Sequence, residues 1–172
     1  HLRDVSRAIL EENRLDRSGQ RLKRADFDDL RLLFEPETSA RNQSLEWDIQ
    51  ANDDILNHLA SAPVRQIALN LLLNASSAAP QGGTVSFPCH SNDNGQVELK
   101  VCDDGPGLSQ ADQDRLMSQA PIAPGGGVGL RLVRDLTAGL SGTLVYARTQ
   151  QRTEIVISLP LSLLMPGAGD AG

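Results

Sequence analysis

The sequence predicts an α+β fold, a two-layer α/β sandwich whose mixed, mostly antiparallel sheet is covered on one face by helices. Segments with apolar residues at helical spacing are mixed along the chain with segments in which apolar and polar residues alternate. The strand segments follow one another as hairpins rather than alternating strictly with helices. A length of 172 residues suits one globular domain with a short appended element.

The first third of the chain predicts two helices and a strand. Residues 1–15 carry apolar residues at helical spacing, as the end of a longer amphipathic helix does, and the Ser18-Gly19 pair terminates it. A second helix is expected over Phe27 to Arg41. We expect it to be interrupted or kinked near Pro36, because proline lacks the N–H group that a helix interior requires. Residues 45–49 alternate apolar and polar side chains, which indicates a half-buried strand.

The middle of the chain predicts a helix followed by a hairpin. Residues 64–79 are apolar over a broad face, and Pro63 stands where a helix can begin. Residues 85–89 and 97–101 place apolar side chains on matching faces, and the sequence Asn92-Asp93-Asn94-Gly95 between them is a strong turn signal. These two strands should therefore be antiparallel neighbours.

The last third of the chain predicts one more helix and two more strands. A polar, weakly helical segment, Ser109 to Pro124, separates two glycine-rich sequences. A helix is expected over Val128 to Leu140, because glycines that commonly end helices follow its apolar face. Alternating residues predict strands over Thr143–Arg148 and Thr153–Leu159.

The composition argues against several classes of protein. A formal net charge of −6 disfavours a nucleic-acid-binding protein, which normally carries a basic patch. Cys89 and Cys102 have no metal-binding spacing and fall on opposite faces of the predicted strands, so we expect both to be reduced thiols in a cytoplasmic domain. No apolar run approaches the roughly 20 residues of a membrane helix. We expect no membrane contact in this segment and any anchor of the parent protein outside it.

Two asparagines on the predicted 64–79 helix are the first candidate site residues. Asn70 and Asn74 are four residues apart and therefore share one helix face. Amides in an apolar helix lower its stability unless their hydrogen bonds are met, so they are either satisfied structural residues or ligands. As a ligand, Asn74 could offer its carbonyl oxygen to Mg²⁺, which prefers oxygen, and so hold phosphate oxygens.

The turn directly after the 97–101 strand supplies a second set of candidates. Asp103 stands at the strand end, and Gly105 and Gly107 permit a tight turn. A carboxylate in this place can accept a hydrogen bond from the exocyclic amino group of adenine, which would distinguish adenine from guanine. Asp-Gly and Pro-Gly pairs are also common in ordinary turns, so this sequence is ambiguous on its own.

A glycine run immediately before a helix is the third candidate. Its residues are Gly125, Gly126, Gly127, Val128, Gly129 and Leu130. Glycines in this position let backbone N–H groups and the positive end of the helix approach phosphates. A glycine run can also be a flexible linker, but a helix that begins inside the run favours the phosphate-binding interpretation.

In this order, the three segments resemble the ATP-binding catalytic domain of two-component sensor histidine kinases. This family belongs to the superfamily of DNA gyrase, heat-shock chaperones and mismatch-repair ATPases. Asn70–Asn74 is similar to its N box, Asp103–Gly107 to its first glycine box and Gly125–Gly129 to its second. Thr153 stands where the family has a threonine that helps to hold adenine. The resemblance covers about Phe27 to Leu161 and implies an ATPase-type α/β sandwich with a mobile lid.

The resemblance also implies an activity, cofactors and partners. The domain would bind ATP with Mg²⁺ and transfer the γ-phosphoryl group to a histidine on a separate dimerisation domain. A response regulator would then receive the phosphoryl group. Asn70 and Asn74 would be the catalytic residues, with Mg²⁺ at Asn74. The parent kinase would be a homodimer with a cytoplasmic catalytic part, and it could be anchored in a membrane.

Asn70 separates branches of this superfamily. Gyrase-like ATPases and anti-sigma-factor serine kinases usually place a glutamate general base at this position, and an amide cannot take that proton. Two departures keep other functions open: Ser77 stands where many members have a basic residue, and the aromatic lid motif is missing. The alternatives are a degenerate nucleotide-binding or protein-interaction module without kinase activity, and an anti-sigma-factor-type serine kinase, which Asn70 disfavours.

The expected domain organisation has three parts. Residues 1–18 would be the end of a dimerisation helix, residues 19–162 the ATP-binding catalytic domain, and residues 163–172 a disordered tail rich in Gly and Ala. We expect the phosphoacceptor histidine outside this sequence. His1 would lie on the second dimerisation helix, whereas the acceptor of the family lies on the first.

Overall fold

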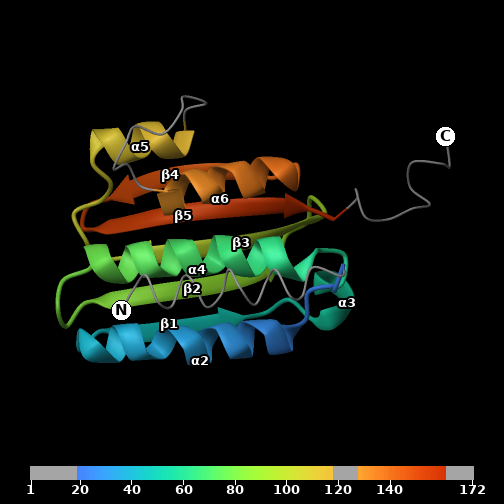
Figure 1. Cartoon of the computed structure of the whole chain (residues 1–172), viewed down its shortest axis with the longest axis horizontal. Coiled ribbons are helices and arrows are strands. Elements are labelled where there is room, and N and C mark those ends of the chain that lie inside the picture. The colour runs from blue at the N-terminus through green and yellow to red at the C-terminus, as the bar shows by residue number, and fades with distance from the viewer. Residues whose placement is uncertain (1–18, 118–127, 162–172) are drawn as a thin grey trace, which may run out of the picture.

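One five-stranded sheet organises the described part of the chain, which is residues 19–117 and 128–161 of the computed structural model. Its strand order is β1-β2-β3-β5-β4 (Figure 1). The strands are β1 (Ser44–Ile49), β2 (Thr84–Ser91), β3 (Gln96–Asp103), β4 (Thr143–Thr149) and β5 (Arg152–Pro160). The helices are α2 (Arg24–Ala40), α3 (Asp53–Leu56), α4 (Ser61–Ala78), α5 (Gln110–Met117) and α6 (Val128–Gly139).

The strand pairing confirms the predicted fold class. β1 runs parallel to β2, and the pairs β2–β3, β3–β5 and β4–β5 are antiparallel, so the sheet is mixed and mostly antiparallel. The predicted hairpin is present, and the backbone N–H of Asn92 donates to the carbonyl oxygen of Gln96 across its turn at 2.9 Å. Six odd-numbered residues of the hairpin strands face the core and are buried: Val85, Phe87, Cys89, Val97, Leu99 and Val101.

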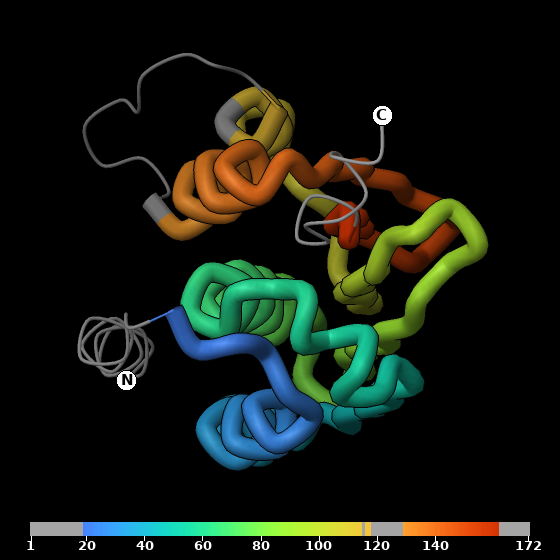
Figure 2. Tube along the Cα trace, turned by 90° about the vertical axis from the view of Figure 1, so that its right-hand side faces the viewer, coloured from blue at the N-terminus to red at the C-terminus, as the bar shows by residue number. Residues whose placement is uncertain are grey.

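Helices cover one face of this sheet. Figure 2 shows α2, α4 and α6 side by side on one side of the strands, and α4 packs against both of the other two. Aromatic rings fill the core beneath α2: the ring centroid of Phe87 lies 5.7 Å from that of Phe27 and 4.7 Å from that of Trp47. Aliphatic side chains of α4 fill the centre of the core, where Ile67 and Leu72 are fully buried.

The expected interruption at Pro36 is wrong. The α2 helix continues without a break from Arg24 to Ala40 with Pro36 inside it. Proline deprives the carbonyl group of residue 32 of its helical partner. Both Pro36 and Leu32 lie on the exposed side of the helix, and Leu32 is 70% exposed, so water can replace the missing donor. Pro63 lies in the first turn of α4, where the N–H groups have no intrahelical partner in any case.

The two cysteines lie as the alternation of the predicted strands indicates. Cys89 and Cys102 are both free and buried, on opposite faces of the sheet. The segment between the two glycine sequences forms the α5 helix as far as Met117, and residues 118–127 lie outside the described part. The expected dimerisation helix (residues 1–18) and the expected tail (residues 163–172) also lie outside it. Among the described helices, none is long and apolar enough to cross a membrane.

A buried glutamine fixes the C-terminal end of α4. The Nε2 atom of Gln43, just before β1, donates to the carbonyl oxygens of Ser76 at 2.9 Å and Ala79 at 3.2 Å. Its Oε1 atom accepts a hydrogen bond from the Ser76 hydroxyl at 2.6 Å. The last carbonyl groups of a helix lack intrahelical donors, so Gln43 satisfies the end of α4 and ties it to the start of β1.

Replacement of Gln43 by alanine should lower the free energy of unfolding by about 1–3 kcal/mol, because buried groups of α4 lose their partners. Urea denaturation followed by circular dichroism measures this. Gln50→Ala is the matched control: Gln50 lies just beyond the other end of β1, and its exposed side chain bonds the Asp48 carboxylate at 3.0 Å. The control should change stability by less than about 0.5 kcal/mol. Equal losses in the two variants would contradict the role of Gln43.

Candidate functional site

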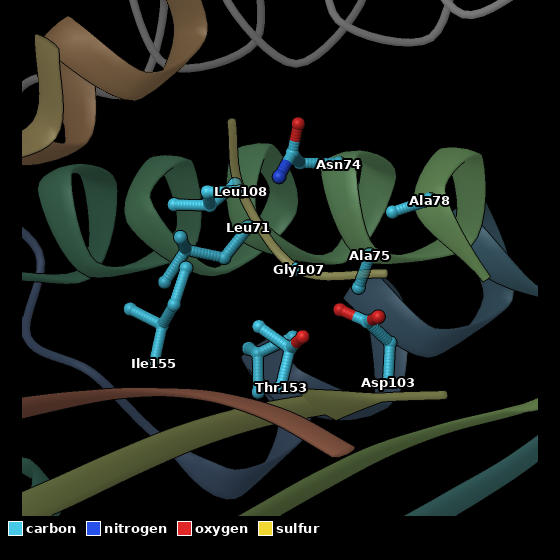
Figure 3. A pocket seen from close by; sticks show the side chains of 10 residues that line it. Leu71, Asn74, Ala75, Ala78, Asp103, Gly107, Leu108, Thr153 and Ile155 are labelled. Carbon is cyan, nitrogen blue, oxygen red and sulfur yellow. The ribbon is translucent and has the colours of Figure 1, made fainter. Parts of the chain in front are cut away.

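A pocket lies between the α4 helix and the ends of β3 and β5. Figure 3 shows α4 above the pocket, with Asp103 and Thr153 rising from the strands beneath it. The pocket holds about 280 Å³ of empty space, part of it open to solvent. Its walls are mostly aliphatic, with three polar side chains; the lining residues are Leu71, Asn74, Ala75, Ala78, Val101, Asp103, Gly107, Leu108, Thr153 and Ile155. A mostly apolar pocket with few polar groups is typical of a small-molecule site.

Two polar side chains at the bottom of the pocket come from adjacent strands. Asp103 is the last residue of β3, and Thr153 lies directly opposite it on β5. Both are buried, with 7% and 2% of their surface exposed. Side chains directly opposite each other on one face of a sheet lie within about 5.5 Å of each other at their Cβ atoms. Asp103 and Thr153 therefore present a carboxylate and a hydroxyl to the same part of the pocket.

The electrostatic environment of Asp103 is unfavourable for its charged form. Burial raises the pKa of this carboxyl above its ordinary value, and the negative charge of Asp104 acts in the same direction. A hydrogen bond from the Gly105 N–H, 2.7 Å from Oδ1, lowers the pKa and partly offsets these effects, as do the charges of Arg148 and Arg152. The site therefore holds a carboxylate that lacks the partners water would supply, and a ligand with an N–H group could supply one.

The glycines of the Asp103–Gly107 turn are required by close packing. An added Cβ atom at Gly105 would lie 2.5 Å from the carbonyl oxygen of Ala78 and 2.7 Å from Oδ1 of Asp103. Gly107 has a φ of +88°, in the left-handed region that glycine adopts without strain. The turn can thus lie directly against the end of α4, which no other residue type at position 105 would allow.

The two predicted asparagines lie along one side of α4 but have different surroundings. Asn74 lines the pocket, and in Figure 3 its amide oxygen points away from Asp103 and Thr153. Asn70 lies one turn earlier and is not among the pocket residues; its Nδ2 atom donates to the carbonyl oxygen of Gln66 at 2.8 Å. With its N–H group engaged, Asn70 directs its Oδ1 atom toward Gly129, where an added Cβ would approach it to 2.9 Å.

The glycine run is only partly described. Gly125, Gly126 and Gly127 lie outside the described residues, whereas Val128, Gly129 and Leu130 form the start of α6. Gly129 allows α6 to approach the Asn70 amide closely, and Leu130 is buried. The structure therefore brings the start of α6 next to Asn70, and Asn74, Asp103, Gly107 and Thr153 into one pocket.

Sequence reasoning missed two residues beside this pocket. The hydroxyl oxygen of Tyr146 accepts a hydrogen bond from the backbone N–H of Leu108 at 3.0 Å. Nη1 of Arg148 donates to the carbonyl oxygen of Gly105 at 2.8 Å and to Oγ1 of Thr153 at 2.7 Å. Both side chains come from β4, on the face that carries Leu144 toward the core. The alternation of β4 could have placed an arginine on its inner face, but the contact with the turn depends on the strand order.

The described residues contain no ready-made metal centre and no histidine in the pocket. Within residues 19–117 and 128–161, no group of three or more His, Cys, Asp or Glu side chains could hold a metal ion. His58 and His90 are absent from the pocket lining. His90 lies on the open face of the sheet, where its Nε2 atom is 3.4 Å from the Glu98 carboxylate.

The family and the related proteins that this chain resembles agree with one another. Residues 60–163 match the family described as histidine kinase-, DNA gyrase B-, and HSP90-like ATPase. The histidine protein kinase DivJ of Caulobacter vibrioides is 30% identical over 95% of this chain and 29% of its own length. The histidine-protein kinase/phosphatase MprB of Mycobacterium ulcerans is 32% identical over 49% of this chain and 18% of its own length. The chain thus spans less than a third of the length of these relatives.

Solved structures share the fold of this chain. Full-length ShkA, in complex with AMPPNP, superposes with a TM-score of 0.68 at 25% identity, over 83% of this chain and 31% of that chain. The nucleotide-free catalytic domain of the histidine kinase ThkA superposes with a TM-score of 0.66 at 16% identity, over 80% of this chain and 92% of that chain. The ThkA domain thus shares the fold of the present chain across nearly its whole length.

The raised pKa of Asp103 predicts how stability changes with pH. Because the folded chain binds this proton more tightly than the unfolded chain, ionisation of Asp103 opposes folding. The resulting loss of folding stability is absent well below the ordinary pKa of 3.8. It grows as the pH rises from this value through the raised pKa of the folded state. The Asp103→Asn variant, which cannot titrate at this position, should therefore gain stability relative to the wild type as the pH rises from about 3 to 7. Urea denaturation across this range measures the difference, and a pH-independent difference would contradict the prediction.

Proposed function

The chain belongs to the histidine kinase-, DNA gyrase B-, and HSP90-like ATPase family, and we propose that it binds Mg-ATP and phosphorylates a histidine on a separate dimerisation domain. The family prediction made from the three sequence motifs is confirmed by the match and by the histidine kinases among its relatives. The observation that carries the proposal is the buried carboxylate of Asp103 beside Thr153 in an otherwise aliphatic pocket.

The pocket has the chemistry that an adenine ring requires. The exocyclic amino group of adenine could donate to the Asp103 carboxylate, which accepts one short hydrogen bond from the described residues, from the Gly105 N–H. The Thr153 hydroxyl lies opposite Asp103 and could complete the polar edge of the site. The faces of the ring would lie between aliphatic side chains of α4 and β5, such as Leu71 and Ile155. Guanine has a carbonyl group in place of the amino group, and this carbonyl would face the carboxylate unfavourably.

The phosphates are assigned to the side of α4 that carries Asn70 and Asn74, next to the start of α6. Asn74 and Asn70 lie along this side of the helix, and the start of α6 approaches Asn70. The N–H groups at the start of a helix attract phosphates, so Gly129 and Leu130 would contribute backbone donors, together with Gly125, Gly126, Gly127 and Val128. Amide oxygens fit Mg²⁺, which keeps several waters and needs few protein ligands. When bound, Mg²⁺ would neutralise phosphate charge during phosphoryl transfer.

The nucleophile must come from outside the described residues. Asn70 is an amide and cannot act as a general base toward water or a serine hydroxyl, which disfavours a hydrolase or a serine kinase. His58 and His90 do not line the pocket. A histidine presented by a dimerisation domain would supply the nitrogen nucleophile, and positioning by the site would supply most of the catalysis.

The proposed domain organisation follows from this assignment. Residues 19–162 would form the catalytic domain, with residues 1–18 the end of a dimerisation helix and residues 163–172 a tail. The partners would be the dimerisation domain of the same homodimeric kinase and a response regulator that takes the phosphoryl group from its histidine. Ser77, exposed on α4, stands where the family resemblance leads us to expect a basic residue. A degenerate module that binds no nucleotide is therefore the alternative that a binding experiment must exclude.

Asp103→Asn should weaken binding of ADP about 10- to 150-fold, because the adenine amino group loses a charge-assisted hydrogen bond worth about 1.5–3 kcal/mol. Isothermal titration calorimetry with MgADP measures the affinity. Asp104→Asn is the matched control, since the adjacent carboxylate is exposed and bonds the backbone N–H of Thr84 at 2.8 Å instead. The control should bind as the wild type does. Equal affinities of the wild type and the Asp103 variant would remove adenine recognition from Asp103.

The isolated chain should not incorporate label from γ-³²P-ATP, because the catalytic residues are present and the acceptor is not. It should label an added dimerisation domain from the same kinase in a manner that is acid-labile and base-stable, as expected of phosphohistidine. A dimerisation domain with its acceptor histidine replaced by glutamine is the control and should stay unlabelled. Strong labelling of His1 in the isolated chain would overturn the proposed domain assignment.

A further inference from the structure

Two side chains of the β4 edge strand hold the turn that forms one wall of the pocket. Arg148 donates from Nη1 to the carbonyl oxygen of Gly105 at 2.8 Å. Tyr146, two residues earlier on the same face, accepts from the N–H of Leu108 at 3.0 Å. Both ends of the turn are therefore hydrogen-bonded to β4, although more than 35 residues separate the partners in the chain.

Gly107 lies between these two attachments. An added Cβ atom at Gly107 would lie 2.8 Å from the Tyr146 hydroxyl oxygen and 2.9 Å from Cδ of Arg148. The backbone of the turn is thus in direct contact with both side chains, with no space for a larger residue. Since Gly107 and Leu108 line the pocket, the β4 side chains determine the position of this wall.

Arg148 also determines the orientation of the Thr153 hydroxyl. Nη1 of Arg148 lies 2.7 Å from Oγ1 of Thr153. An arginine can only donate, so the threonine oxygen must be the acceptor, and its single proton has to point elsewhere. Asp103, Thr153 and Arg148 are consecutive neighbours across β3, β5 and β4. The proton of the Thr153 hydroxyl is therefore free to point away from Arg148, toward the pocket and Asp103.

We infer that Arg148 and Tyr146 are positioning residues that set the selectivity of the site for the adenine base. Arg148 fixes the donor direction of Thr153, and both residues fix the turn that contributes Gly107 and Leu108 to the pocket wall. The Asp103–Thr153 pair then presents one fixed arrangement of acceptor and donor to the base edge. This inference rests on the proposed function, because it assigns to both residues a role in recognising the nucleotide of that site.

Arg152 offers a matched comparison for the charge of Arg148. It lies one residue before Thr153 on β5, so its side chain is on the opposite face of the sheet, where Nη2 donates to the Ser86 hydroxyl at 3.1 Å. Its charge acts on the Asp103 carboxyl in the same direction as that of Arg148. Within the described part of the chain, the Arg152 side chain makes no hydrogen bond to the turn or to Thr153. Replacing either arginine by glutamine removes one positive charge, but only Arg148→Gln removes the two positioning hydrogen bonds.

The experiment compares the affinities of ADP and inosine diphosphate for the 172-residue chain by calorimetry. Inosine has a carbonyl group where adenine has its amino group, so the ratio of the two affinities reports on base selectivity. Arg148→Gln should lower this ratio about 3- to 10-fold, the effect of one hydrogen bond at the base edge. Arg152→Gln should leave the ratio unchanged. Tyr146→Phe, which keeps the ring and removes the hydroxyl acceptor, should lower the ratio by a smaller factor and provides a test if Arg148→Gln does not fold.

The outcomes separate this inference from the proposed function. An unchanged ratio in folded Arg148→Gln and in Tyr146→Phe, with the wild type still preferring ADP, would overturn the positioning role and leave the proposed function intact. An equal fall in the ratio for both arginine variants would overturn it as well, because charge alone would then explain the effect. If Arg148→Gln lowered the affinities for ADP and inosine diphosphate by the same factor, Arg148 would have a purely structural role. Failure of the wild type to bind ADP would contradict the proposed function itself.

Discussion

The pocket exists because the turn after β3 packs directly against the last residues of α4. The absence of a side chain at Gly105 permits this contact, since an added Cβ would lie 2.5 Å from the Ala78 carbonyl oxygen. The same approach directs the Gly105 N–H toward the Asp103 carboxylate. The end of α4 is held in turn by Gln43, which bonds Ser76 and Ala79. A shift of α4 would therefore disturb the pocket wall and the main hydrogen bond to Asp103 together.

Asp103 illustrates a conflict between folding and ligand recognition. Burial removes the carboxylate from water and raises its pKa. Within residues 19–117 and 128–161, a short hydrogen bond from Gly105 and the charges of Arg148 and Arg152 offset this effect in part. If the protein supplied all the hydrogen bonds that the buried carboxylate loses from water, the fold would be more stable. A hydrogen-bond donor on a ligand would then add less binding free energy. Incomplete compensation of a buried charge is a common feature of functional sites. The network around Asp103 is therefore better suited to binding than to stability.

Strand order brings together residues that are remote in the sequence. Because β5 inserts between β3 and β4, Thr153 lies opposite Asp103 on one side and opposite Arg148 on the other. These three side chains form one row across the floor of the site, on the face covered by helices. The open face carries a different set of polar contacts, such as the one between Arg152 and Ser86. The sheet thus separates the hydrogen bonds around Thr153 from those of its other face, although the charge of Arg152 still acts on Asp103.

The sequence alone determined the five strands and the longer helices, but not the short helix α3, and it showed where the Asn70–Asn74 and Asp103–Gly107 motifs fall on them. These properties arise from local periodicity and backbone preferences, which need no knowledge of distant partners. Only the tertiary structure decided that α2 continues through Pro36, since that depends on which side of the helix meets water. It also decided the parallel pairing of β1 with β2 and the contacts of Tyr146 and Arg148. Such contacts depend on strand order and register, which are set by the packing of the whole chain and leave no local pattern.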